Sequence, residues 1–193
     1  MGLNVLLLGP QGAGKGTQAK RIASAYGIPH VATGDMLRAS IAERSDVGMR
    51  VKSVVESGRL VPDELMIDLI RARIAAEDTD AGFILDGFPR TTAQAEALDT
   101  MFGDIGRNFS VVFALQLGDQ VAVERLLLRG KLEGRVDDNP DAIAKRLAAY
   151  HRETEPLVEY YRTRGNLVTI NADRTEGEVF DELQGVLEQA AVA

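Results

Sequence analysis

The chain has 193 residues, with 22 lysines and arginines against 29 aspartates and glutamates, which gives a net charge of −7 at pH 7. This length favours one main domain with insertions and needs no disulfide or metal to stabilise it. The acidic balance argues against non-specific binding to nucleic acid or to an anionic membrane. The absence of cysteine excludes disulfides, thiolate zinc sites and thiol catalysis. Two histidines, His30 and His151, are too few for an all-imidazole metal site, and we expect packing or surface roles for both.

No part of the sequence has the pattern of a targeting or membrane segment. The first residues lack a basic region, and the apolar run at 5–8 is too short for a signal peptide. A myristoylation signal would require Ser or Thr where Leu6 stands. No stretch approaches the roughly 18 apolar residues that span a bilayer. We therefore expect a soluble, cytoplasmic protein without a membrane partner.

Short apolar runs alternate along the chain with longer amphipathic segments. The runs lack polar alternation, which is typical of strands buried on both faces of a parallel sheet. They lie at residues 4–8, 29–32, 82–85, 109–117 and 167–171. A helical period predicts helices at residues 15–26, 63–76, 92–101, 120–128, 140–164 and 176–189. This alternation predicts an α/β fold, a doubly wound parallel sheet with helices on both faces.

Two prolines bear on the predicted helix at residues 140–164. Asn139 followed by Pro140 predicts a helix start, with an N-cap and a proline at the first helical position. Pro156 lies inside the segment that follows and should kink or split that helix. Two intervals fall outside the strand–helix rhythm: residues 33–62, with short helical segments of their own, and the polar, glycine-flanked residues 129–138. We expect both to be mobile appendages on a rigid sheet.

A glycine-rich loop follows the first predicted strand and opens the first helix: Gly9-Pro10-Gln11-Gly12-Ala13-Gly14-Lys15-Gly16-Thr17. Such a loop turns backbone N–H groups onto an anion, while the helix N-terminus adds partial positive charge and the lysine reaches the outer phosphates. In the common form of this motif, Ser or Thr follows the lysine and ligates magnesium. Here Gly16 takes that place and Thr17 follows, so the hydroxyl is displaced by one position.

Asp86 ends the third predicted strand beside this loop. A carboxylate at that point would lie near the water shell of a magnesium ion held by bound phosphates. An aspartate at a strand end also serves as a simple cap, but the neighbouring phosphate loop favours the metal role.

Three motifs together resemble the adenylate kinase family of nucleoside monophosphate kinases: residues 9–17, Thr33-Gly34-Asp35-Met36-Leu37-Arg38, and Asp86-Gly87-Phe88-Pro89-Arg90-Thr91 with Gln94. The resemblance continues in chain order through Arg125, Arg129, Gly134-Arg135-Val136-Asp137-Asp138 and Arg146. It implies a magnesium-dependent phosphotransferase that converts ATP and AMP reversibly into two ADP, in purine nucleotide homeostasis. It also implies a P-loop NTPase-type sheet of five strands within a single domain over 1–193, with an AMP-binding flap at 33–62 and a lid at 129–138.

The resemblance assigns phosphate contacts to seven cations, namely Lys15, Arg38, Arg90, Arg125, Arg129, Arg135 and Arg146. Arginine suits this role because its planar fork binds phosphate oxygens bidentately and stays charged. By the same resemblance Arg38 and Arg90 would hold the AMP phosphate, whereas Lys15 and Arg125 would act at the ATP phosphates. No general base is expected, because a phosphate with a second pKa of about 6 is already largely dianionic at pH 7.

The remaining cations are assigned to the lid side of the site. Arg135 and Arg146 would straddle the transferring group, and Arg129 would lie along the adenine or phosphates of ATP. Asp137 and Asp138 would orient these arginines. Without the resemblance, an acidic pair in a polar loop is more typical of an exposed, solvated turn.

The resemblance also implies binding sets for both nucleotides. ATP would contact Gly12, Ala13, Gly14, Lys15, Gly16, Thr17, Arg129 and, through its main chain, Arg174. AMP would contact Thr33, Arg38, Arg59, Leu60, Val61, Gly87, Phe88, Pro89, Arg90, Gln94, Arg135 and Arg146. Thr33 and Gln94 would hydrogen-bond the AMP base, and a polar pocket of this kind rejects pyrimidine acceptors. Thr33 also fits a helix N-cap before Gly34.

Only residues 130–134 separate Arg129 from Arg135. Many bacterial relatives carry a larger lid here, often with a zinc-binding cysteine cluster, so this chain resembles the short-lid form without zinc. We expect the lid to close over ATP and exclude water, with Gly130 and Gly134 as candidate hinges. We further expect a monomer whose partners are ATP, AMP and ADP.

Two other functions stay open at this point. A nucleoside monophosphate kinase with a different acceptor would share the phosphate loop and the arginines. A nucleotide-binding switch that hydrolyses its nucleotide slowly would share only the loop. The switch predicts a guanine-reading Asn-Lys-x-Asp motif, which the sequence lacks, and it leaves the second group of arginines unexplained.

Overall fold

The structure, a computed structural model, describes residues 2–192, without the side chains of residues 190–192. Its strands are β1 (Leu3–Leu8), β2 (His30–Ala32), β3 (Gly82–Asp86), β4 (Val111–Gln116) and β5 (Leu167–Asn171). They form one sheet in the order β2-β3-β1-β4-β5, and every pairing is parallel. The predicted doubly wound parallel sheet of five strands is therefore confirmed.

Helices follow the strands as the hydrophobic period predicts. They are α1 (Lys15–Tyr26), α2 (Thr33–Ala42), α3 (Asp46–Glu56), α4 (Asp63–Ile74), α5 (Thr92–Asp104), α6 (Asp119–Glu133), α7 (Pro140–Ala149), α8 (Pro156–Arg162) and α9 (Glu176–Val192). A short 3₁₀ turn, Glu77–Thr79, lies before β3. Within the described residues, no helix is long and apolar enough to cross a membrane.

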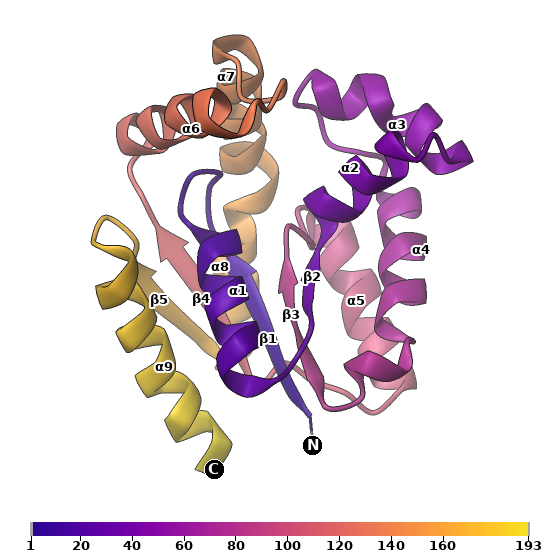
Figure 1. The fold of residues 1–193 in the computed structure, drawn as a ribbon. Coiled ribbons are helices and arrows are strands. Elements are labelled where there is room, and N and C mark those ends of the chain that lie inside the picture. Colours follow the sequence, from indigo (N-terminus) through magenta and orange to yellow (C-terminus); the bar gives the residue numbers. More distant parts are fainter. Residues whose placement is uncertain (1, 193) are drawn as a thin grey trace.

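The sheet is buried on both faces, because successive side chains of its strands enter two different cores. In β1, Leu6 and Leu8 pack with α4, α5 and α8, whereas Val5 and Leu7 pack with α1 and α9. Figure 1 shows these two helical layers on either side of the strands. The absence of polar alternation in the strands has this physical cause.

The predicted long helix at 140–164 is split near its middle. Asn139 caps α7 by accepting a hydrogen bond from the backbone N–H of Ala142, as the sequence indicates. A π-helical turn, Tyr150–Thr154, then separates α7 from α8, which begins at Pro156. Proline lacks an N–H, and its ring clashes with a carbonyl one turn earlier, so the regular hydrogen-bond ladder is interrupted there.

Two helix pairs stand at the end of the sheet where the strands finish, the α2–α3 pair and the α6–α7 pair (Figure 1). The α6–α7 pair has a small core of its own. The predicted helix at 120–128 extends further than expected, to Glu133, so half of the predicted lid is helical. Gly130 lies inside this helix, where a Cβ would come within 3.1 Å of Asp138, and Gly134 ends the helix in a left-handed conformation.

Gly82 supplies a test of the sheet's packing. It begins β3 opposite Leu3 with φ +124°, and a methyl group on it would overlap the Leu3 carbonyl oxygen. We expect Gly82→Ala to lower the free energy of unfolding by about 3 kcal/mol, from backbone strain plus overpacking. Gly103→Ala is the control: this α5 position has open space, and alanine should stabilise it by up to about 1 kcal/mol. Urea unfolding of both variants measures the difference, and a loss of similar size in both would contradict the interpretation.

Candidate active site

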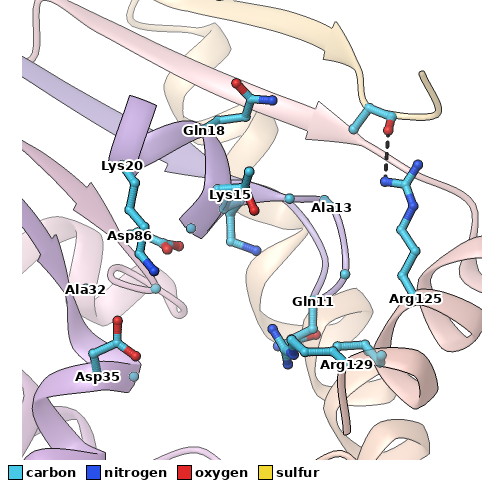
Figure 2. A pocket seen from close by; sticks show the side chains of 18 of the residues that line it. Gln11, Ala13, Lys15, Gln18, Lys20, Ala32, Asp35, Asp86, Arg125 and Arg129 are labelled. Atoms are coloured by element: carbon cyan, nitrogen blue, oxygen red, sulfur yellow. Dashed lines mark hydrogen bonds between the residues drawn. The ribbon is translucent and has the colours of Figure 1, made fainter. Parts of the chain in front are cut away.

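The main cavity, about 490 Å³ in volume, lies between the ends of the strands and the two helix pairs. All seven predicted cations line it, together with the phosphate loop. In Figure 2, Gln11, Ala13 and Lys15 follow the loop, Arg125 and Arg129 come from α6, and Asp86 and Asp35 lie on the opposite side. The structure therefore brings together residues that are more than 130 positions apart in sequence.

The phosphate loop holds Lys15 at the start of α1. Its ammonium group donates hydrogen bonds to the carbonyl oxygens of Gly9 and Pro10, at 2.7 and 2.8 Å. Gly14 occupies the N-cap position in a left-handed conformation, and no side chain caps the helix. The amide donors of the first helical turn are thus available to an anion in the cavity, where the helix dipole adds positive potential.

The cationic groups in the cavity weaken one another's charged forms. Burial, together with the charges of Arg90 and Arg146, lowers the pKa of Lys15 to about 8, against the opposing charge of Asp86. Burial also lowers the pKa of Arg90 to about 10, with Arg146 and Arg38 acting in the same direction. A bound polyanion would relieve this repulsion, because an opposite charge favours the protonated forms.

A second, smaller cavity of about 60 Å³ adjoins the first. Its lining includes the predicted base-site residues Thr33, Arg59, Leu60, Val61 and Gln94. Arg38, Arg90 and Arg146 line both cavities, so they stand at the boundary between them. This arrangement offers two binding spaces joined across a set of guanidinium groups.

Asp138 organises two of the cleft arginines. It receives a bidentate pair of hydrogen bonds from Arg129, at 2.6 and 2.8 Å, and a further bond from Arg146 at 2.8 Å. Asp137 accepts from Arg146 through its carboxylate and its backbone carbonyl, both at 3.2 Å. The two aspartates are 7% and 4% exposed, so this acidic pair is buried and does not form the solvated turn that its composition suggests.

The other arginines pair with a backbone carbonyl or with exposed acids. Arg125 donates to the carbonyl of Ala172 at 3.0 Å, Arg135 pairs with Glu133 at 2.6 Å, and Arg38 pairs with Asp35. Exposed ion pairs such as those of Arg135 and Arg38 are weak, so these two side chains can turn towards a ligand at small cost. Arg174 also lines the main cavity, while its guanidinium pairs with Glu182.

Asp86 is the carboxylate nearest the phosphate loop. Burial raises its pKa, but nearby His30 and the charges of Lys15 and Arg90 outweigh this and hold the pKa below its usual value. His30 Nε2 lies 3.5 Å from Asp86 Oδ2, so the histidine borders the site instead of only filling space. Asp86 is therefore ionised at neutral pH.

The donor set around Asp86 fits magnesium carried by a nucleotide. Magnesium takes oxygen ligands, keeps several waters and commonly uses one or two carboxylates with substrate phosphates. Asp86 supplies one carboxylate on the cavity wall, next to Gly16. Among the described residues, no group of three or more His, Cys, Asp or Glu is placed to hold a metal ion without such phosphates.

Thr33 does not cap its helix, which corrects the N-cap interpretation. The N-cap of α2 is Ala32, and Thr33 is the first helical residue, with its hydroxyl donating to the carbonyl of Asp86 at 3.2 Å. The sheet register explains this contact. Ala32 on β2 is paired with Asp86 on β3, so the next residue, Thr33, lies beside the Asp86 carbonyl. Thr33 is thereby fixed in the wall of the smaller cavity.

Some predicted residues lie elsewhere, and others were missed. Phe88 belongs to the hydrophobic core, and neither it nor Pro89 lines either cavity. Asp63 and Met66 of α4 were missed: Met66 lines the smaller cavity, and Asp63 holds Gln94 through a 2.7 Å hydrogen bond. The only local signal for Asp63 is an acidic residue at a helix start, which normally indicates capping.

Comparisons with known proteins agree with this geometry. Residues 7–166 match the protein family described as "Adenylate kinase". An adenylate kinase of a Cyanothece species is 44% identical over 185 residues, covering 96% of this chain and 95% of its own. One of Xanthomonas euvesicatoria is 42% identical, covering 96% and 99%, and one of Methanosarcina barkeri is 39% identical, covering 98% and 100%. The chain belongs to the adenylate kinase family and is a phosphotransferase.

Proposed function

We propose that the protein transfers a phosphoryl group reversibly from ATP to AMP to give two ADP, with magnesium, and so serves purine nucleotide homeostasis. The observation that carries the proposal is the boundary between the two cavities, which Arg38, Arg90 and Arg146 line from both sides. A phosphoryl group passing from one nucleotide to the other must cross this boundary. The related adenylate kinases support the choice of nucleotides.

ATP would occupy the main cavity, with its phosphates on the loop at the start of α1. Lys15 would release its two carbonyl acceptors and donate to the outer phosphates, while Arg125 approaches from α6. Magnesium would supply charge neutralisation on those phosphates, with Asp86 holding its water shell. Arg129, fixed by Asp138, would lie along the same nucleotide.

AMP would occupy the smaller cavity with its phosphate at the boundary. Arg38 reaches this boundary from α2, and Arg90 reaches it from the segment between β3 and α5. Arg90 is oriented by a 2.8 Å hydrogen bond that its Nε donates to the Gly87 carbonyl. The base would lie along residues 59–61 and meet Thr33 and Gln94, which are 1% and 2% exposed. Polar groups this deeply buried reject a base that leaves them unpaired.

The chemistry requires alignment and charge stabilisation more than proton removal. A dianionic AMP phosphate attacks the γ-phosphorus of ATP directly, the bond to the β–γ bridging oxygen breaks, and ADP leaves. Arg146, which lines both cavities, is placed to stabilise the charge of the transferring group, with Arg135 beside it. Donors held in place before the reaction avoid reorganisation during it.

We further propose that residues 33–62 act as the AMP-binding flap and residues 129–138 as a short lid. The α2–α3 pair carries Thr33, Leu37 and Arg38, so its position governs access to the smaller cavity. Both binding spaces and all seven cations come from one chain. This supports action as a monomer.

Steady-state assays with ATP and each of AMP, CMP, UMP and GMP test the acceptor. AMP should be the preferred acceptor, and ADP should form in a ratio of two for each ATP consumed. A poor response to AMP would favour another nucleoside monophosphate kinase. Binding of ATP without any transfer to a monophosphate would instead favour a nucleotide-binding switch.

Replacing Arg90 and Lys15 separates acceptor binding from transfer. Arg90→Ala should raise KM for AMP about 100-fold, since a buried charged contact is worth about 3 kcal/mol. The KM for ATP should change by less than about threefold. Lys15→Ala should lower kcat about 1,000-fold, because its contact strengthens as charge develops on the phosphates.

Arg71→Ala, an exposed α4 position outside both cavities, is the matched control and should match wild type in every constant. Thermal unfolding of each variant separates lost contacts from lost structure. If Arg90→Ala keeps the wild-type KM for AMP, the role assigned to Arg90 is wrong.

Asp138→Asn tests the electrostatic support of the lid arginines. Burial raises the Asp138 pKa, but hydrogen bonds and charge from Arg129, with Arg146, outweigh this and lower it. A carboxyl group whose pKa is lowered by folding stabilises the protein above its unfolded-state pKa, about 4, and this contribution disappears as pH falls through the lower folded-state pKa. We expect a loss of about 3 kcal/mol in the free energy of unfolding at pH 7, smaller near pH 3, with reduced turnover.

Urea unfolding at both pH values measures this difference. Asp141→Asn, an exposed acid in the first turn of α7, is the control and should cost less than about 1 kcal/mol. An Asp138→Asn loss of equal size at both pH values would argue for a packing role instead of a charge role.

A further inference from the structure

Asp63 joins two helices behind Gln94, which lines the smaller cavity. It lies in the first turn of α4, partly buried, and both of its carboxylate oxygens accept hydrogen bonds from the start of α5. Gln94 Nε2 donates to Oδ1 at 2.7 Å, and Thr91 Oγ1 donates to Oδ2 at 2.9 Å. Thr91 in turn is the N-cap of α5 and accepts from the Gln94 backbone N–H at 3.2 Å.

The Gln94 amide is held from both of its ends. Its nitrogen donates to Asp63, and its oxygen accepts from the backbone N–H of Arg90 at 2.7 Å. A carboxylate can only accept and a backbone N–H can only donate, so only one of the two amide orientations satisfies both partners. The network therefore determines which amide atom lies at each position, a choice that shape alone would leave open.

Among the residues that the structure describes, the held amide keeps one hydrogen-bonding position unused on each atom. A side-chain amide has two N–H donors and two carbonyl lone pairs, and Asp63 and Arg90 take one of each. Gln94 is 2% exposed and lines the smaller cavity, so the remaining donor and acceptor can meet a base there. Their places are fixed as long as the amide cannot turn over.

Purine bases differ in the pattern that they present to such an amide. A 6-aminopurine offers a donor at its 6-amino group and an acceptor at N1, whereas a 6-oxopurine offers an acceptor at O6 and a donor at N1. A base whose position is fixed by its phosphate and sugar can match the amide in only one orientation. The mismatched base would leave buried polar groups unpaired, which weakens its binding by about ten- to a hundredfold.

We propose that Asp63 is a positioning residue that sets the purine selectivity of the acceptor site. By holding the Gln94 amide in one orientation, it selects a 6-aminopurine monophosphate over a 6-oxopurine monophosphate. The inference rests on the proposed function, since it requires the acceptor base to lie in the smaller cavity. The carboxylate is suited to this role because a charged acceptor holds the amide N–H more strongly than a neutral one.

The test compares AMP with IMP, which exchanges the donor and acceptor at these two ring positions, in the full-length protein with saturating ATP. Asp63→Asn keeps the size of the side chain but offers Gln94 either a donor or an acceptor, and Asp63→Ala offers neither. In both variants KM for AMP should rise about tenfold. The AMP:IMP ratio of kcat/KM should fall about tenfold, with kcat for AMP within about twofold of wild type.

Asp68→Asn is the matched control, because it makes the same change at an exposed position on the same helix and should leave the ratio unaltered. Thermal unfolding shows whether each variant folds. If Asp63→Asn does not fold, the AMP:IMP ratio of Asp63→Ala tests the inference. An unchanged AMP:IMP ratio in a folded variant, whatever happens to kcat, overturns the inference, since a purely structural link would not distinguish the bases.

Wild-type protein is assayed first: no phosphorylation of AMP would overturn the proposed function itself, whereas normal wild-type activity with an unchanged variant ratio overturns only the role of Asp63.

Discussion

Keeping seven cationic side chains around one cavity is the constraint on which the rest of the site depends. Burial and mutual repulsion lower the pKa of Lys15 to about 8 and that of Arg90 to about 10, so part of the cluster is destabilised until an anion arrives. Buried carboxylates offset some of this repulsion, Asp138 between Arg129 and Arg146 and Asp86 beside Lys15. The phosphates of two nucleotide substrates would supply the remaining negative charge, which connects affinity for nucleotides directly to the stability of the folded cleft. The net charge of −7 conceals this local reversal of sign.

The fold creates this cluster by ending its strands beside the same cleft. The phosphate loop follows β1, Asp86 ends β3, and the α2–α3 and α6–α7 pairs bring arginines from two further parts of the chain (Figure 1). Ligands bind at the carboxyl ends of strands in open α/β sheets for this geometric reason. The two buried cores lie on either face of the sheet beneath the site, whereas α6 and α7 share a separate small core.

The sequence predicted correctly those features that depend on residues close together in the chain. The strands, most helix limits, the phosphate loop and the break at Pro156 all follow from backbone conformation or hydrophobic period within a few residues. An isolated arginine carries no such signal, so the arginines of the cleft follow only from the resemblance, whereas Lys15 follows from the phosphate loop itself. The N-cap assigned to Thr33 is wrong because of a contact between distant segments: the β2–β3 register gives the Thr33 hydroxyl a partner other than its own helix. Asp63 and Gln94 are 31 positions apart, and only the folded chain shows that they touch.

The most direct test of the central claim, that one cleft holds two nucleotides across a shared set of cations, is calorimetric binding of a dinucleotide whose phosphates bridge two adenosines. The shared boundary predicts one molecule per chain, with an affinity at least about 100-fold higher than that for ATP or AMP alone, because linking the two halves makes the second contact intramolecular. Two molecules per chain, or an affinity no higher than that for ATP, would contradict it.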